Sequence, residues 1–210
     1  MQSFNLVLVR HGHVEGIHPE RFRGQLDLPL TSLGQAQARE TAKFLAEHWP
    51  AQAVYTSPLG RCKDTGAEIA QAQGLQSEPL QELIDINYGV WQGRAREEVK
   101  ESEPERFQGW MTQPHITVIE GADSLQDVQS RLVRALHKMR LNHDGKTVIV
   151  VGHDSTNRVL LMLGLDLPLS RYWHLQQDPC AINVLRFDGT GCRVVVMNQT
   201  AHLSGITLKA

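Results

Sequence analysis

The sequence has few cysteines and no long apolar run. Its three cysteines, Cys62, Cys180 and Cys192, are odd in number and far apart, which argues against a disulfide framework and against a zinc site. No apolar run is long enough to cross a bilayer, and the chain enters its first expected strand without the pattern of a signal peptide. These absences favour a soluble protein of the reducing cytoplasm.

A large excess of charge of either sign is also missing. Lys and Arg number 21 against 23 Asp and Glu, so the formal net charge is −2, and we expect neither a nucleic acid nor a membrane as partner. The ten histidines invite a metal site, but His11, His13 and His18 lack regular ligand spacing, so we expect no metal and no cofactor. The chain of 210 residues is predicted to form a single domain over residues 1–210, as a monomer or a homodimer.

Short apolar runs alternate with amphipathic stretches along the chain. Strands are expected over residues 6–9, 53–56, 147–151, 181–187 and 193–198, and helices over residues 32–49, 58–73, 124–142 and 155–164. Hydroxyl groups of Ser57, Ser124 and Ser155 are the expected N-caps. This alternation predicts an α/β fold, a three-layer α/β/α sandwich around a mostly parallel central sheet.

Two of the expected strands end in a histidine. The first apolar run, residues 6–9, stops at Arg10 and His11, and the run at 147–151 is followed by His153, just before a helix. Ligands of α/β proteins bind outside the carboxyl ends of parallel strands, and helix N-termini attract anions. The two strand ends are therefore predicted to share an anion site, although a histidine at a strand end can also simply cap or pack.

A third strand end adds a second arginine, Arg61. It falls in the first turn of an expected helix, where a cation opposes the helix dipole and indicates an anion nearby. The plainer alternative is a surface arginine paired with Asp64 or Glu68. Two guanidinium groups beside two imidazoles would suit the oxygens of a phosphoryl group.

Five blocks of sequence extend this pattern over nearly the whole chain. They are Arg10-His11-Gly12, residues 21–25 with 27–34, residues 56–59 with Arg61 and Thr65, residues 83–93, and Gly152-His153. In this order the blocks resemble the histidine phosphatase superfamily, also called the phosphoglycerate mutase-like family.

The resemblance implies a role for each matching residue. His11 matches the nucleophile that becomes a phosphohistidine. Arg10, Arg61 and His153 match the groups that hold the phosphoryl oxygens, with His153 expected as an imidazolium. Asp85 falls where the family places its proton donor, which would act as general acid and then as general base.

The proton donor is one of several departures from the family pattern. Many members carry a glutamate at the position of Asp85, and Glu82 is a nearby alternative for the role. Ile17 stands where many members have an asparagine, and Arg23 replaces a hydroxyl residue. Asp154 would put a negative charge near the phosphate unless it points away or pairs with Arg158. The residues expected to bind the substrate are Arg23, Gly24, Gln25 and Ser155.

Residues 94–122 interrupt the alternation of strands and helices. In the resembled family this region forms a small cap insertion over the C-terminal strand edge, where the substrate is selected. Trp110, Met111 and His115 are candidates to line the pocket, although packing of the cap against the body is the favoured interpretation. The glutamates of this region are expected to be solvated.

The resemblance implies a metal-independent phosphomonoester hydrolase acting on a small phosphorylated metabolite. A phosphoglycerate mutase is the main alternative, but mutases of the family are usually longer and carry an arginine pair and a proline-rich stretch in the cap, which this sequence lacks. A catalytically weak phosphate-binding module is the other. The segment at 21–27 resembles the α-ribazole phosphatase and broad-specificity branches.

Overall fold

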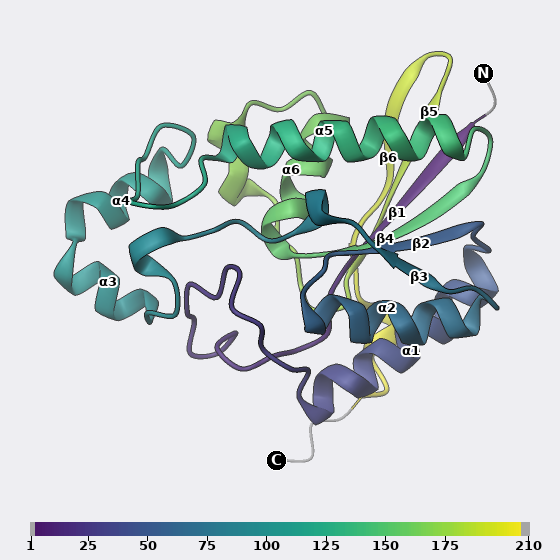
Figure 1. The fold of residues 1–210 in the computed structure, drawn as a ribbon, viewed down its shortest axis with the longest axis horizontal. Helices are drawn as coiled ribbons and strands as arrows, with labels where there is room; N and C mark the ends of the chain where they lie inside the picture. Colours follow the sequence, from purple (N-terminus) through teal and green to yellow (C-terminus); the bar gives the residue numbers. More distant parts are fainter. Residues whose placement is uncertain (1–2, 207–210) are drawn as a thin grey trace.

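A six-stranded sheet forms the centre of the protein in the computed structural model, which describes residues 3–206 (Figure 1). The strands are β1 (Phe4–Arg10), β2 (Ala53–Thr56), β3 (Ser77–Pro79), β4 (Thr147–Gly152), β5 (Ile182–Asp188) and β6 (Gly191–Gln199). They follow the order β3-β2-β4-β1-β5-β6, and the first four in this order are parallel. β5 and β6 form the expected antiparallel hairpin at one edge, so the predicted mostly parallel sheet is confirmed. Residues 1–2 and 207–210 of the predicted domain lie outside the described residues.

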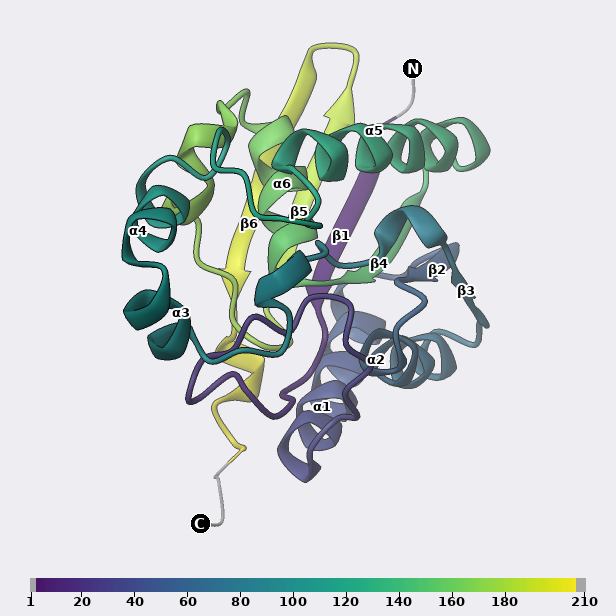
Figure 2. The same cartoon turned by 60° about the vertical axis from the view of Figure 1, so that its left-hand side comes forward.

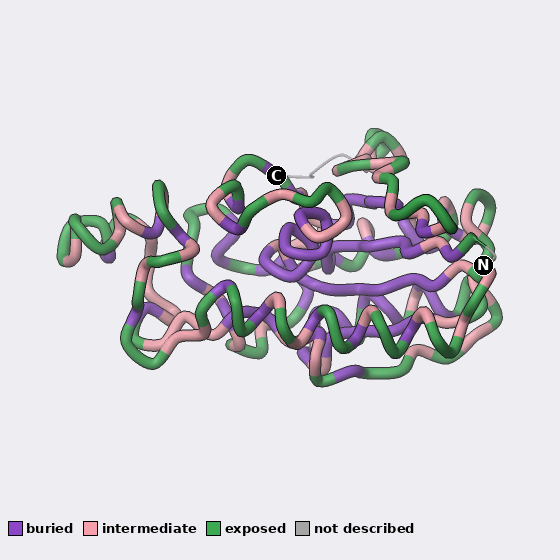
Figure 3. The backbone as a smooth tube through the Cα atoms, turned by 90° about the horizontal axis from the view of Figure 1, so that it is seen from above, coloured by how far each residue is buried: buried purple, intermediate pink, exposed green. Residues whose placement is uncertain are grey.

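Four helices cover the two faces of this sheet. They are α1 (Ser32–His48), α2 (Gly60–Ala72), α5 (Leu125–Asn142) and α6 (Asp154–Gly164). Figures 1 and 2 show α1 and α2 on one side and α5 and α6 on the other. Alternate residues of β1 supply both cores, since Leu6 and Leu8 pack in the first and Val7 and Val9 in the second. The three-layer prediction is confirmed, and Figure 3 shows the buried backbone gathered between the outer helices.

The helix starts agree only in part with the hydroxyl signals in the sequence. Ser124 caps α5 in the predicted way, because its hydroxyl accepts from the Asp127 amide and Asp127 accepts from the Ser124 amide in return. The prediction that Ser57 caps a helix from residue 58 is wrong, because α2 begins at Gly60. The cap predicted at Ser155 is also wrong, because α6 begins at Asp154 and Ser155 lies inside its first turn. The two hydroxyls bond the side chains of His153 and Asp85 instead, as described below.

Two glycines bring the turn after β1 against the start of α1. A Cβ on Gly12 would lie 2.4 Å from the carbonyl oxygen of Gly34, and a Cβ on Gly34 would lie 2.2 Å from the carbonyl oxygen of His13. Backbone atoms form both contacts, so neither position has room for a larger residue. The turn that carries His11 is thereby fixed against the first helix.

Two short helices, α3 (Arg96–Ser102) and α4 (Pro104–Thr112), lie beyond the carboxyl ends of the central strands (Figures 1 and 2). Trp110 of α4 is buried against three aromatic rings, with centroid separations of 5.9 Å to Tyr88 and 5.8 Å to both Tyr172 and Trp173. Trp110 therefore packs the insertion onto the body.

Most glutamates of the insertion are exposed, as expected from the sequence. Glu103 is not, because it accepts from Arg94 and from the indole of Trp91.

Within residues 3–206, every helix is too short or too polar to cross a bilayer. The same residues contain no group of three or more His, Cys, Asp or Glu side chains arranged to hold a metal ion.

Candidate active site

Four basic side chains meet where β1, β2 and β4 end. Arg10 is the last residue of β1 and His11 follows it, His153 follows β4, and Arg61 stands in the first turn of α2, which follows β2. All four are buried, with exposed fractions of 5% or less. The rings of His11 and His153 are 5.3 Å apart between centroids. The structure therefore brings together the four residues that the sequence predicted would converge.

The imidazole of His11 is held in one orientation and kept neutral. Its Nδ1 lies 2.7 Å from the carbonyl oxygen of Gly12, so this nitrogen donates a proton to the carbonyl and Nε2 keeps its lone pair. Burial lowers the pKa of His11 well below 6.5, and the charge of Arg61 lowers it further. A neutral imidazole with a free Nε2 is the form that a nucleophile needs.

Arg61 is fixed by the loop that precedes α1 and by a carboxylate. Its Nη1 donates to the carbonyl of Leu26 at 2.6 Å, and its Nη2 donates to the carbonyl of Gly24 at 2.7 Å and to Oδ2 of Asp85 at 3.1 Å. The alternative of a surface arginine paired with Asp64 or Glu68 is wrong, because the side chain is fully buried and its partner is Asp85.

Arg10 is fixed by the loop before β5. Its Nη1 donates to the carbonyl of Gln177 at 2.5 Å, and its own carbonyl accepts from the Cys180 amide at 3.0 Å. The side-chain amide of Gln177 forms a reciprocal pair with the buried Asn183, at 3.0 and 2.8 Å. Among residues 3–206, no acceptor bonds the buried Nε of Arg10 or of Arg61. Two guanidinium donors are therefore free for an anion.

Burial and positive charge favour the neutral ring of His153, whereas its imidazolium form beside a phosphoryl group stays a prediction. Its pKa lies well below 6.5 because the ring is buried, and because Arg61 and Arg10 add positive charge nearby. Its Nε2 lies 2.7 Å from the hydroxyl oxygen of Ser57, and its Nδ1 lies 3.6 Å from Oδ2 of Asp85. The hydroxyl that was expected to cap α2 thus orients this ring.

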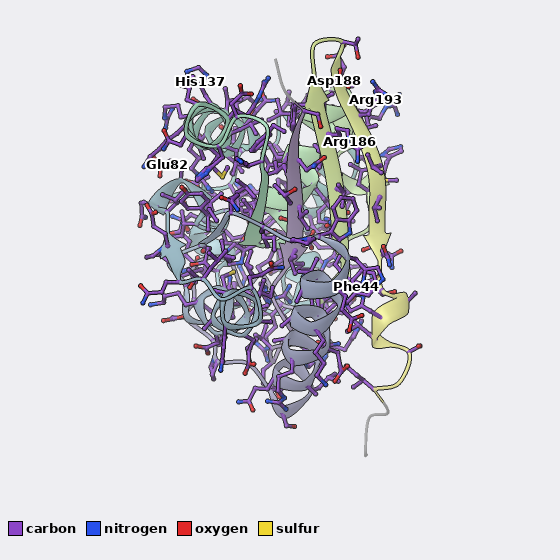
Figure 4. All side chains as sticks on the ribbon, turned by 90° about the vertical axis from the view of Figure 1, so that its right-hand side faces the viewer. Phe44, Glu82, His137, Arg186, Asp188 and Arg193 are labelled. Carbon is purple, nitrogen blue, oxygen red and sulfur yellow. The ribbon has the colours of Figure 1, made fainter. Side chains whose placement is uncertain are left out.

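Asp85 lies inside the site and Glu82 lies outside it. Oδ1 of Asp85 accepts from the Ser155 hydroxyl and from the Ile86 amide, and Oδ2 accepts from Arg61. Glu82 belongs to a single turn of 3₁₀ helix, residues Gln81–Leu83, and lies at the outer edge of the molecule in Figure 4. Of the two carboxylates that the sequence offered, the geometry therefore favours Asp85 as proton donor.

A cleft of about 450 Å³ opens above these groups. Its inner wall includes Arg10, Gly24, Asp85 and Ser155, while His11, Arg61 and His153 are buried outside the lining. Gln25 is absent from the lining because its amide is turned to the carbonyl of Asp85, to which Nε2 donates at 3.0 Å. The contact of Gln25 with the substrate stays a prediction.

The outer wall of the cleft is rich in arginine. Arg23 lines it as expected, and so does Met111 of the insertion, whereas Trp110 and His115 are absent from the lining. The remaining lining includes Arg21, Arg96, Arg158 and Trp173.

Two guanidinium groups lie over the ring of Trp173. Arg158 lies 4.8 Å and Arg96 lies 5.4 Å from the ring centroid, measured from Cζ. Each arginine also has a carboxylate partner, Asp154 for Arg158 at 3.0 Å and Glu20 for Arg96. The pairing of Asp154 with Arg158 is one of the two outcomes that the sequence left open.

Sequence reasoning missed several residues that shape this site. Ser57 and Gln177 orient the basic groups, Trp173 organises the outer wall, and Arg131 of α5 supports the segment of Asp85. Ser57 was noticed, but its position before a helix gave a capping signal instead. The other three carry no local pattern that distinguishes them from packing or surface residues.

A neutral buried imidazole beside two guanidinium groups with free donors defines a site for phosphoryl transfer. Residues 6–200 match the model of the histidine phosphatase superfamily (branch 1), and the chain belongs to this family. It is a phosphatase of this superfamily.

Relatives match the chain over most of its length. Phosphoserine phosphatase 1 of Hydrogenobacter thermophilus is 34% identical over 206 residues, which cover 98% of this chain and 97% of that protein. The adenosylcobalamin/alpha-ribazole phosphatase of Salmonella typhimurium is 26% identical over 173 residues, or 82% and 85% of the two chains. Among solved structures, Bacillus stearothermophilus YhfR superimposes with a TM-score of 0.88 at 27% identity, over 95% of this chain and 99% of that one.

Proposed function

We propose that this phosphatase hydrolyses small phosphomonoesters through a covalent phosphohistidine on His11. One observation carries the proposal: Nδ1 of His11 is committed to the Gly12 carbonyl, so the neutral ring offers Nε2 between the arginines. Positive charge from Arg10 and Arg61 supplies the neutralisation that metal ions supply in other phosphoryl-transfer sites. We propose no metal and no cofactor for this reaction.

The first step transfers the phosphoryl group to the enzyme. The free donors of Arg10 and Arg61, with His153, hold the equatorial oxygens. Nε2 of His11 attacks phosphorus in line, a P–N bond forms and the P–O bond to the leaving group breaks. Asp85 takes a proton from the bound phosphomonoester monoanion and gives it to the leaving oxygen, so the alcohol departs neutral.

The second step returns the enzyme to its starting form. The carboxylate of Asp85 accepts a proton from water as that water attacks the phosphorus of the phosphohistidine. The P–N bond breaks, Asp85 passes its proton to the departing phosphate, and His11 recovers its neutral ring. Ser155 and Arg61 hold the two carboxylate oxygens in place through both steps.

We propose further that the substrate carries a second anionic group, such as a carboxylate. Arg21 and Arg23 line the outer cleft and donate to the carbonyls of Gly93 and Gly16, and within residues 3–206 no carboxylate forms an ion pair with either. Two guanidinium groups already lie over the ring of Trp173, which disfavours stacking of a nucleotide-like leaving group. The name of the Hydrogenobacter relative, phosphoserine phosphatase 1, agrees with an amino acid or hydroxy acid phosphate.

The test is phosphate release from a panel of substrates without added metal. O-phosphoserine and 3-phosphoglycerate should be turned over with higher kcat/KM than a neutral sugar phosphate or α-ribazole 5′-phosphate. His11→Ala should abolish release and the acid-labile phosphoenzyme. Bisphosphate-stimulated conversion of 3-phosphoglycerate to its 2-isomer would instead establish the mutase alternative, and phosphate binding without release would establish the binding module.

Three wider expectations belong to the same proposal. Residues 94–122 act as the cap that selects the substrate, to which the lining position of Met111 contributes. The protein acts in the cytoplasm as a monomer or homodimer, without nucleic-acid or membrane partners. The three free cysteines suit a reducing compartment, and cell fractionation with sedimentation of the purified protein tests location and assembly.

A further inference from the structure

The segment that carries Asp85 is held from behind by one arginine of α5. Nη1 of Arg131 donates to the carbonyls of Glu82 at 2.8 Å and Ile84 at 2.5 Å, and Nη2 donates to the carbonyl of Asp85 at 3.1 Å. A single guanidinium thus bonds three carbonyls within four residues of chain. Its five donors in a fixed plane make such multiple attachment possible.

Arg131 is itself set on a rigid support. The neighbouring residues Val128, Leu132 and Ala135 are buried in the core, and α5 is an 18-residue helix. The side chain of Arg131 is 13% exposed, and Asp123 lies 3.8 Å away as its counter-charge. This support fixes where the three carbonyls can lie relative to the sheet.

The same helix region holds the segment on the other side of Asp85. Oδ2 of Asp123 accepts from the Asn87 amide at 3.0 Å, and the Asp123 amide donates to the Asn87 carbonyl at 2.9 Å. Ties at residues 82, 84, 85 and 87 therefore bracket the carboxylate. Asp85 has a side chain with few rotatable bonds, so the position of its backbone decides where its oxygens reach.

We propose that Arg131 is a positioning residue for the proton transfer of Asp85. The inference rests on the role assigned to Asp85 under the proposed function. The hydrogen bonds of Arg131 go to backbone carbonyls of the segment, so it acts through Asp85 and not on the substrate. Removing it frees the segment to move, and a displacement of about 1 Å in a reacting group can lower a rate by about 10²-fold.

Two leaving groups of different basicity distinguish positioning from simple loss of structure. An alkyl phosphate such as O-phosphoserine needs a proton on its leaving oxygen, whereas p-nitrophenyl phosphate releases a weakly basic phenolate that does not. Because kcat/KM reports formation of the phosphoenzyme, it isolates the step in which Asp85 is the acid. Arg131→Met should lower kcat/KM for O-phosphoserine by about 10²-fold, and for p-nitrophenyl phosphate by less than about 3-fold.

Three further measurements complete the experiment. Arg134→Met serves as the matched control, since Arg134 is an exposed arginine of the same helix that donates to Ser130. Its kcat/KM should be unchanged for both substrates. Inhibition by vanadate should be unchanged in Arg131→Met, because the anion-binding groups are untouched. Arg131→Lys keeps the charge with one donor group, and its kcat/KM for O-phosphoserine should lie between those of the wild type and of Arg131→Met.

The Asp85→Asn variant separates failure of the inference from failure of the proposed function. If Asp85→Asn lowers kcat/KM equally for both substrates, Asp85 is not the acid and the proposed role fails. The other outcome is that Asp85→Asn lowers kcat/KM much more for O-phosphoserine than for p-nitrophenyl phosphate. If Arg131→Met then lowers kcat/KM equally for both substrates, or for neither, the positioning role of Arg131 is overturned. Should Arg131→Met unfold at the assay temperature, the same comparison applies to Arg131→Lys.

Discussion

Removing the guanidinium of Arg61 should destabilise the protein as well as inactivate it. In Arg61→Met the carbonyls of Gly24 and Leu26 lose their donors, and the carboxylate of Asp85 loses its cationic partner. Loss of one member of a buried ion pair costs about 3–5 kcal/mol. The side chain of Asp85 is 12% exposed and keeps its bonds from Ser155 and the Ile86 amide, which places the expected loss toward the lower end of that range.

The assay is thermal and denaturant unfolding of the purified variants. For a chain of this size a loss of 1 kcal/mol lowers the melting temperature by about 2–4 °C, so Arg61→Met should melt about 6–20 °C below the wild type. Adding Asp85→Asn should restore about 0.5–3 kcal/mol relative to the sum of the single variants, because the uncompensated charge is gone. A fall of less than about 3 °C, or strictly additive losses, would refute the view that these groups form one buried unit.

Three other outcomes follow from the site. The pKa values of His11 and His153 lie well below 6.5 in the folded protein, so the unfolded chain binds more protons below about pH 6.5. Stability should therefore be full above that pH and fall as the pH decreases, and a flat denaturation series from pH 8 to 5 would contradict the neutral assignment. Activity should survive EDTA and be inhibited by vanadate, which mimics five-coordinate phosphorus, and loss of turnover on chelation would count against a metal-free site. Asn183→Leu should raise KM more than it lowers kcat, because Gln177 loses its partner and releases Arg10, and an unchanged KM in steady-state kinetics would show that the amide pair does not reach the active site.

The sheet and the meeting of the basic groups could be predicted because both depend on strand ends. An apolar run followed by Arg10 and His11 fixes where the chain leaves the sheet, and parallel strands bring His153 to the same edge. The resemblance to the histidine phosphatase superfamily then indicated the remaining residues of the site. Local signals were weaker where one residue type serves two purposes: the hydroxyls of Ser57 and Ser155 both suit an N-cap, yet they bond His153 and Asp85.

Other features arise only when distant segments meet. The lowered pKa of His153 could not be predicted, because burial and two neighbouring arginines act through space and neither can be read from the sequence. Arg131 occupies an ordinary position on an amphipathic helix, 46 residues from the carbonyl of Asp85 that it bonds. The amide of Gln25 lies in a recognisable block, but whether it faces the ligand or the backbone depends on a loop 60 residues away.

The contact between Gly12 and Gly34 has a consequence for how this enzyme can change over evolution. Because carbonyls of each segment occupy the space where the other would carry a Cβ, the turn that holds His11 and the start of α1 can vary only together. New substrate preferences are then expected to arise elsewhere, in the residues around the mouth of the cleft such as Arg23, Met111 and Trp173. A library for altered specificity would leave the two glycines fixed and randomise that rim.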